Sequence, residues 1–221
     1  MRICVIIPVH NEENAIGDIV GSLVKKKQAV IVIDDGSADR SGKIAKDKGA
    51  VVILNENKSG KGYSLRKGFE YAIKEGFDGV ITIDGDGQHD VDDFEKFIDF
   101  ARDNKDIVVN GNRMTDSKGM PFIRRLTNKF MSVLISMACK QSIPDTQCGY
   151  RYIGSGVLNR LNLSSNQFEI ETEILMKAAK NGFKIYSVPI RTIYRNEVSK
   201  INPLKDTIRF FVYFLGEIFS K

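Results

Sequence analysis

Continuous apolar runs alternate with amphipathic stretches along the first hundred residues of the chain. Each apolar run has the length and composition of a buried strand, and the predicted strands are 3–9, 29–33, 51–54 and 79–83. The stretches between them carry apolar residues at helical spacing, and the predicted helices are 14–26, 39 or 41 to 48, and 63–75. This alternation predicts an α/β fold with a mostly parallel central sheet, flanked by helices and joined by right-handed connections.

The second half of the chain continues the pattern less regularly. We expect a strand at 107–109, a helix at 121–137, a loop at 145–151 that leads into a short strand, and helices at 155–161 and 168–181. A late strand at 184–193 contains Pro189, which predicts an edge position or a bulge. Residues 1–202 are expected to form one domain and residues 203–221 a C-terminal amphipathic helix.

Acidic side chains follow three of the first four predicted strands; they are Glu12, Asp34, Asp35, Asp84 and Asp86. Since parallel strands end at one edge of a sheet, where such folds bind ligands, we expect these carboxylates to lie close together. One aspartate after a strand is usually only a helix cap, but three acidic strand ends in succession favour a site. Carboxylates that leave positions for phosphate oxygens suit a divalent cation bound with a diphosphate.

Gly60-Lys61-Gly62 stands just before a predicted helix, where backbone N–H groups and an ammonium suit a phosphate. The spacing matches neither a P-loop nor a dinucleotide fingerprint. An EF-hand is excluded around Asp84, because His89 stands where that loop needs glycine and a strand precedes it. A phosphatase with Asp84 as nucleophile is a distant alternative.

Composition sets limits on these interpretations. The 221 residues are 42% hydrophobic and 28% charged, which is typical of a globular domain. The net charge of +5 suits anionic substrates or an anionic membrane surface, but it is too diffuse to indicate nucleic acid. The cysteines Cys4, Cys139 and Cys148 are expected to be reduced thiols with a structural role. No apolar run approaches the roughly 20 residues of a spanning helix.

Four ordered motifs, Ile6–Glu13, Ile33–Ser37, Gly60–Gly62 and Asp84–His89, resemble those of the family-two glycosyltransferases with the GT-A fold. Within that family the chain is most similar to dolichol-phosphate mannosyltransferases and bacterial polyprenyl-phosphate glycosyltransferases. The match continues through the segments 111–113, 124–128, 145–151 and 188–190, and so covers nearly the whole chain.

The resemblance implies roles for residues on the donor side. Pro8, His10 and Glu12 would line the base and ribose pocket, where His10 replaces a frequent aromatic residue. Asp34 and Asp35 would contact the nucleoside of a GDP- or UDP-sugar, and Lys61 its phosphates. Asp84, Asp86 and Gln88 would hold Mg²⁺ or Mn²⁺ and the diphosphate. Mannose or glucose is the expected sugar, and the family implies that transfer inverts the anomeric centre.

A polyprenyl or dolichyl phosphate is the acceptor that the resemblance implies. Such a phosphate is already anionic near neutral pH, so it needs positive charge rather than a base. The candidate cations are Arg113, Arg124, Arg125, Arg151, Arg195 and Lys200. Arg113 and Asp86 are also expected to act in catalysis. The segment 194–200 resembles a loop that closes over the donor, although Glu197 takes a position where relatives commonly have glycine.

Three alternatives stay open at the level of sequence. Transfer to a carbohydrate hydroxyl would need a base, for which Glu169 or Glu171 is the candidate. The phosphatase and an inactive nucleotide-binding module are the other two. The predicted helices 121–137 and 204–219 are amphipathic, and either could lie on a lipid surface or pack on the domain. We expect a cytoplasmic protein, peripheral on the cytoplasmic face of the cell membrane.

Overall fold

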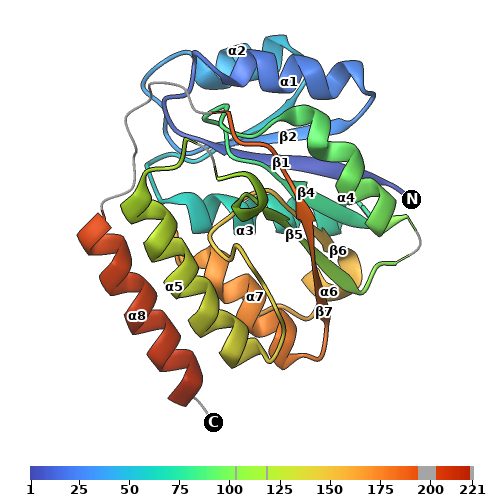
Figure 1. Ribbon diagram of the computed structural model, residues 1–221. Coiled ribbons are helices and arrows are strands. Elements are labelled where there is room, and N and C mark those ends of the chain that lie inside the picture. The colour runs from blue at the N-terminus through green and yellow to red at the C-terminus, as the bar shows by residue number, and fades with distance from the viewer. Residues whose placement is uncertain (103, 118, 194–202, 220–221) are drawn as a thin grey trace.

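The protein is described by a computed structural model that covers residues 1–102, 104–117, 119–193 and 203–219. Its described strands form one seven-stranded sheet in the order β3-β2-β1-β4-β6-β5-β7 (Figure 1). Their bounds are β1 Ile3–Val9, β2 Ala29–Asp34, β3 Val51–Leu54, β4 Gly79–Thr82, β5 Ile107–Asn112, β6 Arg151–Gly154 and β7 Lys184–Pro189. Strand β6 runs antiparallel to both of its neighbours, and the other pairs are parallel.

Helices cover both faces of this sheet. Their bounds are α1 Ile16–Lys25, α2 Ser41–Asp47, α3 Lys61–Lys74, α4 Phe94–Ala101, α5 Phe122–Cys139, α6 Ser155–Leu158, α7 Ile170–Lys180 and α8 Pro203–Phe219. Residues of α1, α2 and α4 share one hydrophobic cluster with alternate β1 residues such as Val5 and Ile7. Residues of α3, α5, α7 and α8 share a second cluster with Cys4 and Ile6, on the other face. Alternation along β1 therefore fills two cores at once.

The expected α/β architecture with a mostly parallel sheet is confirmed, and β7, which contains Pro189, lies at an edge of the sheet as predicted. Several details differ; for example, β5 ends at Asn112 rather than residue 109, and α6 ends at Leu158 rather than residue 161. Helix α3 begins at Lys61 rather than residue 63, β7 ends at Pro189 rather than residue 193, and α4 was not expected at all. The cysteines are free and buried, as anticipated. None of the described helices combines the length and apolar character needed to cross a bilayer.

The parallel register brings the ends of three strands to one edge. Val9 pairs with Asp34 across β1 and β2, and the Asp35 amide donates to the Val9 carbonyl at 2.8 Å. The Ile83 amide continues β4 by donating to the Ile6 carbonyl at 3.1 Å. The acidic segments after β1, β2 and β4 therefore begin side by side.

Helix α3 approaches this sheet closely at Gly68, where a methyl group would lie 2.7 Å from Ile6 Cγ2. Gly68→Ala is expected to lower the free energy of unfolding by about 1–3 kcal/mol, because the tight α3–sheet contact must open. Urea denaturation measures this change. The control Gly21→Ala on α1 meets only ordinary contact with Lys48 at 3.8 Å, and a gain of up to about 1 kcal/mol is expected there. Equal effects of the two substitutions would contradict the packing argument.

Candidate active site

Lys61, the first residue of α3, lies between two carboxylates from distant parts of the chain. Its Nζ is 2.6 Å from Asp84 Oδ1 and 2.8 Å from Glu171 Oε1. Burial alone would lower the pKa of Lys61, but the two carboxylates outweigh it and raise that pKa above its ordinary value. Burial would likewise raise the pKa of Asp84, yet the charge of Lys61 and the contact with His89 hold it well below its usual range.

Two glycines allow the close approach of neighbouring loops to this group. Gly60 has φ of +105°, and a Cβ there would lie 2.3 Å from the Asn166 carbonyl oxygen. The loop before α7 therefore presses directly on the start of α3. A Cβ at Gly149 would lie 2.5 Å from Asp84 Oδ2 and 2.7 Å from Lys61 Nζ. Side chains at either position would separate the charged groups.

The predicted nucleoside residues lie at the same edge. Asp35 is buried and accepts hydrogen bonds from Asn55 Nδ2 and from the amides of Ser59 and Gly60, at 2.8–2.9 Å. It therefore fixes the chain that leads into α3. His10 Nδ1 donates to the Asp35 carbonyl oxygen at 2.9 Å.

The remaining donor-side residues adjoin this pair. Asp34 is buried and accepts from the Ser37 amide at 2.9 Å. A Cβ on Gly85 would lie 3.2 Å from the Pro8 carbonyl oxygen and 3.6 Å from Glu12 Cγ. The end of β1 thus borders the Asp-x-Asp turn.

The Asp84–Gln88 turn fits a divalent cation that is shared with a ligand. Asp84 and Asp86 are both partly exposed, and Asp86 Oδ1 accepts from the Gln88 amide at 3.0 Å. Within the described residues, no group of three or more His, Cys, Asp or Glu side chains is arranged to hold a metal. Two carboxylates are thus the donor set available, which suits Mg²⁺ or Mn²⁺ completed by phosphate oxygens rather than a closed protein cage.

Arg113 and Asp145 form a buried bidentate pair beside the turn. Arg113 Nε and Nη2 donate to the two Asp145 oxygens at 2.7 and 2.9 Å, and the Arg113 amide also donates at 3.0 Å. Burial alone would raise the pKa of Asp145, but the hydrogen bonds from Arg113 lower it. Sequence reasoning assigned Asp145 no role, because its need for a partner becomes visible only once Arg113 is known to be buried.

The other predicted cations occupy different surroundings. Arg151 is fully buried, and its nitrogens donate to the Asn110 side chain and to the carbonyls of Glu171 and Cys148. That position corrects the expectation of an accessible cation, because every nitrogen group of Arg151 is engaged. Arg124 and Arg125 lie on α5, half-buried and exposed. Arg195 and Lys200 lie outside the described residues.

The two candidate bases also differ. Glu171 is buried between Lys61 and Arg151, whose Nη1 is 3.3 Å from Glu171 Oε2. Glu169 stands at the N-cap of α7, and its Oε1 accepts from the Gln167 amide at 3.3 Å. Its Oε2 is buried without a hydrogen-bond partner among the described residues. Glu169 is therefore the carboxylate with fewer hydrogen-bond and ion-pair contacts among the described residues.

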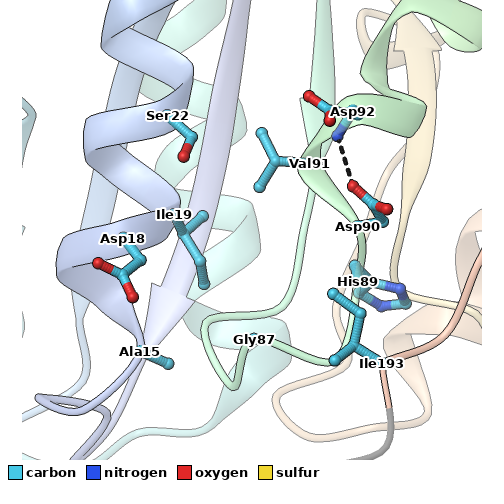
Figure 2. A pocket seen from close by; sticks show the side chains of 10 residues that line it. All are labelled: Ala15, Asp18, Ile19, Ser22, Gly87, His89, Asp90, Val91, Asp92 and Ile193. Atoms are coloured by element: carbon cyan, nitrogen blue, oxygen red, sulfur yellow. Dashed lines mark hydrogen bonds between the residues drawn. The ribbon is translucent and has the colours of Figure 1, made fainter.

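A small cavity of about 190 Å³ lies behind the turn, between α1 and residues 87–92 (Figure 2). Asp18 and Ser22 of α1 line one side, and Asp90 and Asp92 line the other. Asp90 is paired with Arg191 and Asp92 with Lys26. Neither Asp84 nor Lys61 lines this cavity, but His89, which contacts Asp84, does.

The sequence model of Glycosyl transferase family 2 matches residues 4–161. The chain belongs to glycosyltransferase family 2. It is 32% identical over 216 residues to a UDP-N-acetylglucosamine–dolichyl-phosphate N-acetylglucosaminyltransferase from Methanococcus voltae, covering 87% of this chain and 86% of that protein. It is 30% identical over 205 residues to a dolichyl-phosphate hexose transferase from Haloferax volcanii, covering 91% and 87%.

Among solved structures, the glycosyltransferase resembles glucosyl-3-phosphoglycerate synthase from Mycobacterium tuberculosis in complex with Mn²⁺, UDP and phosphoglyceric acid. The TM-score is 0.74 at 19% identity, covering 98% of this chain and 77% of that one. The predicted GT-A fold is confirmed. Family membership also makes the protein a glycosyltransferase, so the phosphatase interpretation is dropped.

The Arg113–Asp145 pair predicts a pH-dependent stability. Asp145→Asn is expected to lower the free energy of unfolding by about 3–5 kcal/mol at pH 7, because it leaves Arg113 buried without a carboxylate. The folded pKa of Asp145 lies below the unfolded value of about 3.9, so the pair stabilises fully above that pH and less as pH falls through the folded pKa. Urea denaturation should therefore show a smaller difference between wild type and variant at pH 3 than at pH 7.

The matched control is Asp99→Asn, which removes the carboxylate of an exposed aspartate–arginine pair with Arg102. Its cost should stay within about 0.5 kcal/mol. An Asp145→Asn cost that is the same at both pH values, or no larger than that of the control, would contradict the assignment.

Proposed function

We propose that this glycosyltransferase moves a sugar, with inversion, from a nucleotide-diphospho-sugar to a polyprenyl or dolichyl phosphate. The observation that carries the donor half is the Asp84–Lys61–Glu171 cluster beside Asp35, at the edge where three parallel strands end. Support for the acceptor half comes from the similar archaeal proteins, whose names state transfer to dolichyl phosphate. The sugar is proposed to be mannose or glucose, carried by GDP or UDP.

On the donor side, Asp34, Asp35 and His10 would bind the nucleoside, with Pro8 and Glu12 bordering its pocket. Asp84 and Asp86, with Gln88, would hold Mg²⁺ or Mn²⁺, and solved relatives of the same fold contain Mn²⁺ and UDP. Bound there, the cation would offset the charge that develops on the leaving diphosphate. Lys61 and the amides at the start of α3 would add positive charge to the same group.

On the acceptor side, the phosphate would attack the anomeric carbon directly, since its second pKa is about 6 and a base is unnecessary. Arg113, with Arg124 and Arg125 on α5, would reduce the electrostatic repulsion between the acceptor phosphate and the donor diphosphate. Arg195 and Lys200 are proposed as further cations. Arg151, with its nitrogens engaged inside the domain, would support the site by holding Glu171 and Asn110.

Exposed apolar faces on α5 and α8 support contact with a lipid surface, where such an acceptor resides. Both helices pack on α7 and lie on the outside of the molecule (Figure 1). Large exposed side chains on α5 are Phe122, Ile123, Leu126, Phe130, Val133 and Met137, and those on α8 are Ile208, Val212, Leu215, Ile218 and Phe219. Helix α5 carries Arg124, Arg125 and Lys129 and no acidic residue, which suits anionic lipid.

We therefore propose peripheral attachment to the cytoplasmic face of the membrane, with residues 203–221 as a partly lipid-facing appendage of a 1–202 catalytic domain. The opposite face of α8 is docked. Phe210 and Phe214 are buried in the core that α5 and α7 share, and Lys180 on α7 pairs with Glu217 at 3.2 Å.

Transfer to a carbohydrate hydroxyl is the second candidate function. The observation that favours it is Glu169 Oε2, which is buried and has no hydrogen-bond partner among the described residues, since a general base needs an oxygen that is not already engaged.

The transfer reaction is tested with Asp86→Asn in assays that combine GDP- and UDP-sugars, Mn²⁺ and a short polyprenyl phosphate. The rate of lipid-linked product formation is expected to fall by about 100-fold or more, because charge stabilisation of the leaving group is lost. Asp92→Asn, an exposed carboxylate six residues further on, should retain the wild-type rate. Transfer by the wild type to a sugar hydroxyl and not to the lipid phosphate would reject the proposed acceptor.

Membrane contact is tested by sedimentation with vesicles that contain anionic lipid. Leu126→Glu places a charge within the exposed face of α5 and is expected to reduce the bound fraction, because a carboxylate must be desolvated beside anionic headgroups. Ile73→Glu, at an exposed apolar position on α3, should bind as the wild type does. Binding that is unaffected by Leu126→Glu would exclude this face.

A further inference from the structure

Both carboxylate oxygens of Asp84 already have a partner. Lys61 Nζ is 2.6 Å from Oδ1, and His89 Nε2 is 3.4 Å from Oδ2. The backbone at Gly149 closes a third side, since a Cβ there would touch both Asp84 and Lys61. A carboxylate oxygen can accept more than one partner, but a cation at Oδ1 would lie close to the Lys61 ammonium, and the two positive charges would repel each other.

His89 is the partner that is held in place. Its side chain is 3% exposed, and its ring centroid is 5.4 Å from that of Tyr150, which stacks on Phe97 at 4.5 Å. The Ile193 amide donates to the Gln88 carbonyl at 2.8 Å and fixes the adjoining backbone. In Figure 2 the ring of His89 points away from α1. Displacing it would open the packed core.

Lys61 is the partner that can move. Its ammonium ends a flexible four-carbon stem, and it already contacts a second carboxylate, Glu171, at 2.8 Å. Leaving Asp84 would not leave Lys61 without a counter-charge. Glu171 itself is fixed, because Arg151 donates to its carbonyl at 3.1 Å and lies 3.3 Å from its Oε2.

The charges of this group favour arrival of the cation together with a diphosphate. Lys61 and Arg151 balance Asp84 and Glu171, and Asp86 adds one negative charge, so a divalent cation alone still leaves an excess of one positive charge in a largely buried group. A cation that brings a diphosphate supplies its own negative charge and gives the displaced ammonium a new partner. Binding of the two should then be mutually reinforcing.

We propose that Lys61 is an exchangeable counter-ion of Asp84. The two side chains stay paired until a divalent cation and the donor diphosphate bind together. The ammonium then passes to the diphosphate, while Glu171 keeps it within reach. Glu171 is in this sense a positioning residue for Lys61 and not a base. The inference rests on the proposed binding of a nucleotide-diphospho-sugar. It adds that the cation and the donor each bind more tightly when the other is present.

The test measures Mn²⁺ binding by calorimetry, first alone and then with saturating UDP or GDP as the probe. Lys61→Met keeps the apolar stem and removes the charge, so Mn²⁺ alone is expected to bind about tenfold more tightly than to wild type. The strengthening of Mn²⁺ binding by the nucleotide is expected to fall by about tenfold, since the transferred ammonium is missing. Glu171→Gln should also reduce that strengthening, but it should leave Mn²⁺ alone bound no more tightly than in wild type.

Lys74→Met removes an exposed lysine from the last turn of the same helix and should change neither quantity. Thermal unfolding checks that each variant is folded, and Lys61→Gln replaces Lys61→Met if the latter is not. Mn²⁺ binding to a folded, uncharged Lys61 variant at or below wild-type affinity would overturn the exchange.

The outcome also separates this inference from the proposed function. Nucleotide-dependent Mn²⁺ binding by wild type, with no gain in the Lys61 variants, rejects the exchange and leaves the donor site standing. If neither wild type nor variant binds Mn²⁺ with or without nucleotide, both ideas are rejected.

Discussion

Charge compensation at the carboxyl edge of the sheet is the constraint on which the rest of this structure depends. A buried or half-buried charge is costly unless it is paired and hydrogen-bonded. The carboxylates after β4 and at the start of α7 meet this requirement through Lys61 and Arg151, and Asp145 meets it through Arg113. These pairs join segments that are far apart in the sequence, so the pairing that stabilises the fold also assembles the site.

The start of α3 is the point where local backbone geometry serves that pairing. Asp35 accepts the amides of Ser59 and Gly60, and Gly60 adopts a positive φ that lets the loop before α7 lie against it. Lys61 follows directly and is therefore aimed at the space between β4 and α7. A residue with a side chain at position 60 would disturb the direction of the lysine as well as the packing of the loop.

Much of the fold could be predicted because its signals are local. Apolar runs predicted the bounds of β1, β2, β3 and β4 to within about two residues of those in the structure. Differences of this size are usual, because the structural bounds are set by hydrogen bonds rather than by the sequence pattern. Antiparallel β6 could not be inferred, because direction depends on the path of the preceding chain. Asp84 and Lys61 could be proposed from motifs, whereas the partnership of Arg113 with Asp145 depends on burial, which residue order does not reveal.

The two ion pairs of Glu171 limit the reactions in which this carboxylate can take part. Glu171 contacts Lys61 through one oxygen and Arg151 through the other, so both oxygens are already engaged and the residue is poorly placed to bind and deprotonate a sugar hydroxyl. Between the two predicted bases, that task would fall to Glu169 alone, which sits in the cap of α7. An acceptor that arrives as an anion makes no such demand. The ion pairs of Glu171 therefore leave Glu169 as the carboxylate on which transfer to an alcohol would depend.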